Sequence, residues 1–108
     1  MCGTRSGFYA VYFTLGLMRI HTIRASVHVD DTVTDRDTWA VDLVEGSSLS
    51  EQLKDGWFWS TWPDRVEFVF SWHGDEASAE SYSREVKAVL SGAPHVTDSP
   101  QLVVETRG

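Results

Sequence analysis

The chain has 108 residues and a mass of 12.1 kDa, which is the usual size of one domain built around one hydrophobic core. Apolar residues make up 42% and charged residues 23%, close to ordinary globular usage, which excludes a disordered, collagen-like or coiled-coil chain. Nine Lys and Arg stand against sixteen Asp and Glu, and the resulting formal charge of -7 disfavours a nucleic-acid partner because it repels phosphate backbones.

The N-terminal segment, residues 1–18, is apolar and admits two interpretations. Its apolar run over residues 8–18 is shorter than the roughly 20 residues of a membrane-spanning helix, so no membrane partner is expected. The aromatic and β-branched residues of this run suit an edge strand; alternatively, translation starts at Met18 and the protein is the single domain of residues 19–108. Cys2 is the only cysteine, so an intrachain disulfide is excluded and a cytoplasmic location is expected.

Alternation of apolar and polar side chains, the pattern of a strand with one wet face, recurs along the chain. In the first such stretch His21, Ile23 and Ala25 share the apolar face, and in a later one Phe68 and Phe70 do. We predict strands over residues 19–30, 39–44, 66–72 and 101–106.

Helix signals occur in two segments. Ser48 and Glu51 have the spacing of a capping box, and Gly56 supplies a residue type that ends helices. From Ser78 onward apolar residues recur at helical spacing, and Asp75 stands where an N-cap is expected. We predict a short helix over residues 49–55, a long helix over residues 78–90, and loops over residues 30–37 and 57–64.

These elements predict one α+β domain. The economical packing is a four- or five-stranded, largely antiparallel sheet with the short and the long helix on one face. Loops of such a domain are the expected carriers of function.

Two polar clusters contain imidazole and carboxylate groups. His28 and Asp30 follow the first predicted strand, and His73 and Asp75 follow the strand over residues 66–72. If these strand ends met, the four side chains could form a polar pocket or a mixed nitrogen and oxygen metal site. The alternative is ordinary turn and cap chemistry. Since no catalytic or metal-binding motif occurs in the sequence, neither a bound metal nor a cofactor is expected.

Three indoles, Trp57, Trp59 and Trp62, lie within six residues of a predicted loop. Such side chains serve as a lid over the core, as anchors in a protein interface, or as walls of a ligand pocket. The acidic loop that contains Asp30, Asp31 and Asp35 is either a solvated turn or a surface for a basic partner.

The function these features favour is a non-enzymatic protein-interaction module that uses the Trp-rich loop. An inhibitor, an immunity-type protein or an assembly subunit fits this description, with another protein or a second copy of the chain as the partner. An enzymatic activity is not favoured by the motif content.

A second interpretation comes from a resemblance. The sequence Phe70-Ser71-Trp72-His73-Gly74-Asp75-Glu76-Ala77, followed by the predicted helix and a closing strand, is similar to the second half of antibiotic-biosynthesis-type monooxygenases. The resemblance covers about a third of the chain and implies a dimeric ferredoxin-like barrel that acts on or binds a small apolar molecule. The implied pocket would use His28 or His73 as its polar group and would be lined by Trp39, Phe68, Phe70, Trp72 and Tyr82. The first half departs from that family, which has a long helix directly after its first strand, where a second strand is predicted here.

Overall fold

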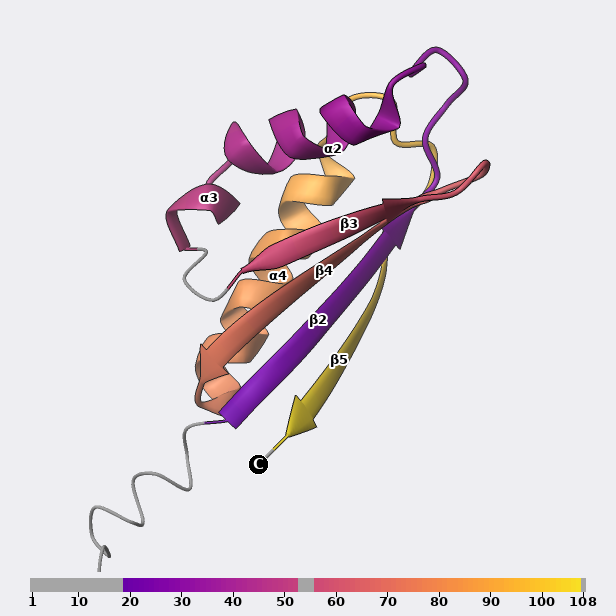
Figure 1. The fold of residues 1–108 in the computed structure, drawn as a ribbon. Helices are drawn as coiled ribbons and strands as arrows, with labels where there is room; N and C mark the ends of the chain where they lie inside the picture. Colours follow the sequence, from indigo (N-terminus) through magenta and orange to yellow (C-terminus); the bar gives the residue numbers. More distant parts are fainter. Residues whose placement is uncertain (1–18, 53–55, 108) are drawn as a thin grey trace, which may run out of the picture.

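The computed structural model describes residues 19–52 and 56–107 (Figure 1). The N-terminal segment, predicted as an edge strand or as upstream sequence, lies outside the described residues, as does the end of the short predicted helix. The elements in chain order are β2 (Arg19–Val27), α2 (Arg36–Glu45), α3 (Leu49–Gln52), β3 (Trp57–Thr61), β4 (Val66–Gly74), α4 (Glu76–Ser91) and β5 (Gln101–Arg107).

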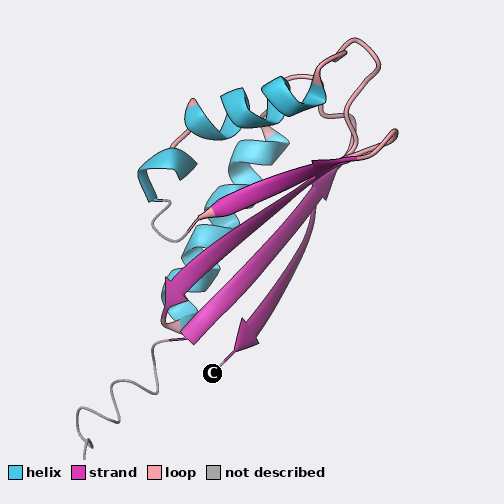
Figure 2. Ribbon diagram, in the orientation of Figure 1, coloured by secondary structure: helices cyan, strands magenta, loops and turns pink. Residues whose placement is uncertain are grey.

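The strands form one antiparallel sheet in the order β3-β4-β2-β5, and the helices cover one of its faces (Figure 2). This confirms the predicted α+β domain. Apart from the short α3, the chain order is strand, helix, strand, strand, helix, strand, with β2 and β4 in the centre. That order is the ferredoxin-like arrangement.

The core lies between the sheet and the helices. The predicted alternation in β2 and β4 is confirmed, because Ile23, Ala25, Phe68 and Phe70 are all fully buried on the helix side. Burial of these side chains stabilises the fold by about 25 cal/mol for each Å² of apolar area removed from water. His21 is buried in the same row and is the buried polar side chain among the described residues.

The strand predicted over residues 39–44 is wrong, because this segment belongs to α2. Asp35 caps the helix, and its carboxylate accepts a hydrogen bond from the backbone N–H of Thr38 at 3.0 Å. Ala40 and Val44, four residues apart, point into the core and are fully buried. The helix therefore follows the first strand directly, and the stated departure from the resembling family disappears.

The loop predicted over residues 57–64 is also wrong in its first part, where β3 pairs with β4. Trp57 and Trp59 alternate with Phe58, as strand side chains do. The irregular piece is confined to the turn around Trp62 and Pro63. Turn-forming residues such as Pro63 and Asp64 predicted a loop over the whole segment, but pairing with the central strand β4 makes its first part a strand.

The long helix is confirmed with slightly wider bounds, as α4. Asp75 is its N-cap, and its carboxylate accepts a hydrogen bond from the backbone N–H of Ser78 at 2.8 Å. The buried residues Ala79, Tyr82, Val86 and Leu90 form the predicted apolar stripe. In the described part of the chain, no helix combines the length and the apolar character needed to cross a membrane.

Candidate functional site

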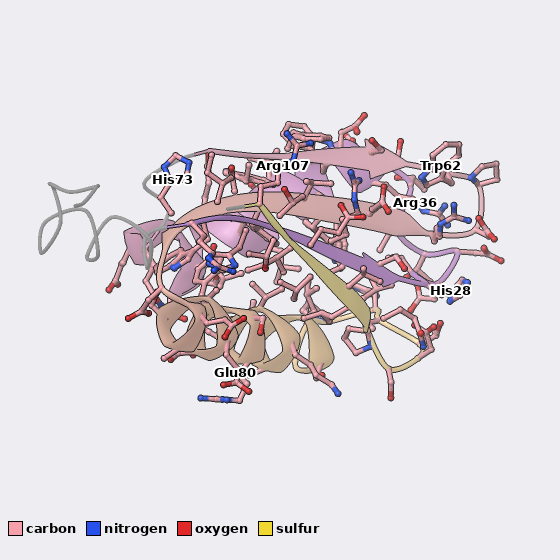
Figure 3. The ribbon with its side chains drawn as sticks, turned by 90° about the horizontal axis from the view of Figure 1, so that it is seen from below. His28, Arg36, Trp62, His73, Glu80 and Arg107 are labelled. Atoms are coloured by element: carbon pink, nitrogen blue, oxygen red, sulfur yellow. The ribbon has the colours of Figure 1, made fainter. Side chains whose placement is uncertain are left out.

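The two predicted polar clusters lie at opposite ends of the sheet (Figure 3). In the antiparallel register of β2 and β4, His73 is opposite Ile20 at the start of β2, whereas His28 follows the end of β2. The polar pocket predicted from His28, His73 and Asp75 is therefore not assembled. Among the described residues no group of three or more His, Cys, Asp or Glu side chains is close enough to share a metal ion.

The cluster of His28 and Asp30 instead contacts residues that are distant in the sequence. The Nδ1 atom of His28 is 2.5 Å from Oδ2 of Asp98, and the backbone N–H of His28 donates to the same carboxylate at 3.0 Å. Asp30 accepts hydrogen bonds from Thr32 and lies 3.3 Å from Nδ1 of His95. These contacts tie the loop after β2 to the segment before β5. Of the turn and cap chemistry named as the alternative, the structure has the cap at Asp75, which begins α4.

The carboxylates in these contacts predict acid sensitivity. Backbone N–H donors hold the pKa of Asp35, Asp75 and Asp98 below the ordinary value, and the Thr32 hydroxyl does so for Asp30. The unfolded chain binds protons at these groups at a higher pH than the folded chain. Their contribution to stability is therefore complete above the ordinary carboxyl pKa of about 3.9 and is lost as pH falls through the lower folded-state values.

We expect the urea midpoint of unfolding to fall steeply below about pH 4, in the window of these depressed pKa values. Asp98→Asn should lower the midpoint at neutral pH and flatten its dependence on acid. Asp31→Asn is the control, because Asp31 is an exposed carboxylate of the loop after β2 and takes no part in the contact between His28 and Asp98. An Asp98→Asn variant with the full acid dependence would contradict the assignment.

Two of the three indoles cover the core. Trp57 stacks on Phe70 with ring centroids 6.0 Å apart, and Trp59 lies against Trp57 at 5.3 Å. The Nε1–H of Trp59 donates to Asp37 at 2.8 Å, which joins β3 to α2. These contacts fit the lid among the three alternatives for the indoles.

Trp62 differs from the other two indoles because it lies in the turn between β3 and β4 and is 45% exposed. Arg36 donates to the backbone carbonyls of Trp62 and Pro63, each at 2.7 Å, and the guanidinium of Arg65 lies 5.1 Å from the Trp62 ring. A hollow of about 410 Å³ lies between this turn and the start of α2, and Asp35 is one of the residues that line it. Of the residues predicted as a partner surface, Trp62 and Asp35 lie together at this end of the molecule.

The aromatic side chains expected to line a pocket are in contact with one another. Phe70 meets Tyr82 edge-on at 5.9 Å, Trp72 stacks on Tyr82 at 4.4 Å, and Trp39 lies 6.2 Å from Phe68. These rings fill the space between sheet and helices and act as the core.

Sequence reasoning missed the face of the sheet that bears no helix, called the open face below. In register across the four strands it carries Phe58, Val69, Arg24 and Val103. Phe58 is 55% exposed, and beside it lies a hollow of about 320 Å³ that reaches Gly56. Phe58 was placed in a loop, so its outward position was hidden.

Sequence reasoning also missed a groove between α4 and β5. It measures about 570 Å³ and is lined by His21, Glu76, Ala77, Ala79, Glu80, Ser83, Val104 and Thr106. His21 was assigned to the apolar face of its strand, and that assignment is correct. What the sequence did not reveal is that β5 brings Thr106 to it.

No family model, curated protein or solved structure matches this chain.

Proposed function

We propose that the chain acts as a non-enzymatic protein-interaction module and that the open face of its sheet binds a second copy of the chain. The observation that carries this proposal is that the open face has an exposed aromatic side chain, Phe58, directly beside a hollow. A symmetric dimer buries the same patch on both subunits, so such a patch must contain both parts of each contact. Phe58 is the projection, and the hollow over Gly56 is its counterpart.

The hollow has room for an aromatic ring. A side chain added at Gly56 would meet no atom of the described residues within 4 Å, and the carbonyl of Gly56 accepts a hydrogen bond from the backbone N–H of Ser71 at 3.1 Å. In the proposed dimer the open faces of the two copies face each other. The two-fold axis lies between the two sheets, perpendicular to the strands, at the level of Trp57. It places Phe58 of each copy opposite Gly56 of the other.

Charges on the open face support the same arrangement. The register places Phe70 and Ile23 at the level of Trp57, so this axis sets His73 opposite the partner's Glu67. Arg24, which lies 3.7 Å from Glu105 within one chain, comes next to a second carboxylate, the partner's Glu105. Arg24 and the partner's Glu105 are therefore opposite charges that meet across the proposed interface.

The test is the molar mass of the full chain by size-exclusion chromatography with light scattering. We expect twice the chain mass of 12.1 kDa for the natural sequence and a single chain mass for Phe58→Glu. Trp62→Glu is the matched control, since Trp62 is an exposed aromatic residue away from the open face. A natural chain that stays monomeric at high concentration, or a Phe58→Glu variant that stays dimeric, would refute the proposal.

The end of the molecule around Trp62 is the second candidate, as the surface for a different protein. It is supported by an exposed indole whose backbone is fixed by Arg36, next to the acidic side chains of Asp35 and Asp37. An anchor of this kind loses little conformational entropy on binding. Dissociation by Trp62→Glu and not by Phe58→Glu would move the self-association surface to this end.

A small-molecule function in a ferredoxin-like dimer is the remaining alternative. It gains support from α2, which supplies the helix after the first strand that the resemblance requires. Its expected aromatic pocket is occupied by packed rings, so any ligand would have to use another space.

A further inference from the structure

The groove between α4 and β5 lies on the helix side of the sheet, away from the open face, and its binding properties do not depend on the proposed dimer. Its volume of about 570 Å³ is within the range of small-molecule sites. His21 is 1% exposed and forms part of the inner wall, while Glu80 stands on the outer side of α4 (Figure 3). The groove therefore has a buried inner wall, to which His21 belongs, and a charged rim, to which Glu80 belongs.

The hydrogen bonds of His21 determine which atoms the inner wall of the groove offers to a ligand. Nε2 lies 3.0 Å from the carbonyl oxygen of Gly74, and because a carbonyl can only accept, Nε2 carries the proton. In the neutral ring Nδ1 is then the acceptor. It lies 2.9 Å from Oγ1 of Thr106, so the Thr106 hydroxyl donates its hydrogen to His21. Oγ1 of Thr106 has only lone pairs left for a ligand.

The other hydroxyl of the groove is in the same condition. Oγ of Ser83 donates to the backbone carbonyl of Glu80 at 2.9 Å, so its hydrogen is also used within the protein. Glu76 and Glu80 add carboxylates, which are acceptors only when ionised. Arg84 lies 3.6 Å from Glu80, but this pair is largely exposed and contributes little against a competing cation.

We propose that this groove is a binding site for a small primary amine in its ammonium form that carries a short apolar group. The hydroxyl and carboxylate groups all accept hydrogen bonds, so the ligand must donate and should be positively charged. Val104, Ala77 and Ala79 supply apolar wall for the rest of the ligand. Anions and neutral acceptors find no side-chain donor among these groups.

The test is a titration of the full chain with benzylamine, followed through backbone amide chemical shifts in NMR spectra at about pH 8, above the ordinary histidine pKa. We expect saturable shifts at Ala79, Ser83 and Thr106. Benzoate, which has the same ring and a negative charge, should cause none. Thr106→Val keeps the side-chain shape, removes the acceptor, and should weaken benzylamine binding about threefold to tenfold.

Glu45→Gln is the control for a general loss of negative charge, because Glu45 is exposed at the end of α2 and does not line the groove. It should leave benzylamine affinity within about twofold, whereas Glu80→Gln should lower it by more. Three results would each overturn the site: benzylamine without saturable shifts, benzoate binding as well as benzylamine, or unchanged affinity in Thr106→Val. Every readout is a chemical shift of residues in the groove, which lies on the helix side of the sheet. Failure of this test therefore leaves the dimer proposal intact, because that proposal concerns the open face.

Discussion

Replacing Phe70 with alanine is expected to reduce the free energy of unfolding by about 3 to 5 kcal/mol, a large part of what a domain of this size has. Phe70 is fully buried in β4, with Phe68, Trp57 and Tyr82 around it at centroid distances of 5.9 to 6.3 Å. Truncation removes its apolar area and leaves a cavity between three rings that cannot all close in. Urea unfolding followed by tryptophan fluorescence measures the effect.

Phe58→Ala is the matched control for this variant. Phe58 is the same residue type on the neighbouring strand, but it points to the open face and is 55% exposed. Measured on monomeric protein, its substitution should change the free energy of unfolding by less than about 1 kcal/mol. Equal losses in the two variants would mean that β3 and β4 do not have the facing assigned to them.

The central strands and the long helix could be predicted from the sequence because their patterns are long and consistent. In β4 the residues Val66, Phe68 and Phe70 alternate with less apolar ones, and only one face of an antiparallel sheet is covered by helices. In α4 the apolar positions recur at three and four residues, and Asp75 supplies the cap. In these elements the local preference and the final packing agree.

α2 could not be predicted because its sequence satisfies two periods. Trp39, Val41 and Leu43 alternate as in a strand, while Ala40 and Val44 have helical spacing. The packing favours the helix, because Ala40 and Val44 then share one face of α2 and are fully buried in the core. Asp35, which caps α2 by accepting from the backbone N–H of Thr38, agrees with the helical period.

The candidate sites depend on contacts distant in sequence, which explains why reasoning along the chain missed them. His28 meets Asp98 across 70 residues, and His21 meets Thr106 across 85. Neither pairing follows from spacing, because both depend on which strand lies beside β2. On the other side of β2, its antiparallel register with β4 separates His28 from His73.

Tyr82 is the other residue whose surroundings the sequence did not reveal. It was expected on the apolar stripe of the long helix, and it lies there, 1% exposed. Its hydroxyl, however, is buried without a hydrogen-bond partner in the described part of the chain. Burial also raises the pKa of Tyr82 far above its ordinary value, because the phenolate would be desolvated.

Tyr82→Phe should therefore increase the free energy of unfolding by about 1 to 2 kcal/mol, the cost of leaving a buried hydroxyl unsatisfied. The phenyl ring keeps the stacking on Trp72 and the edge contact with Phe70. Urea unfolding with an unchanged slope measures the gain, and Tyr82→Leu, which removes the ring, should lose stability. A loss of stability in Tyr82→Phe would show that the hydroxyl has a partner, such as an internal water, and that the ring between sheet and helix is held by a polar contact as well as by packing.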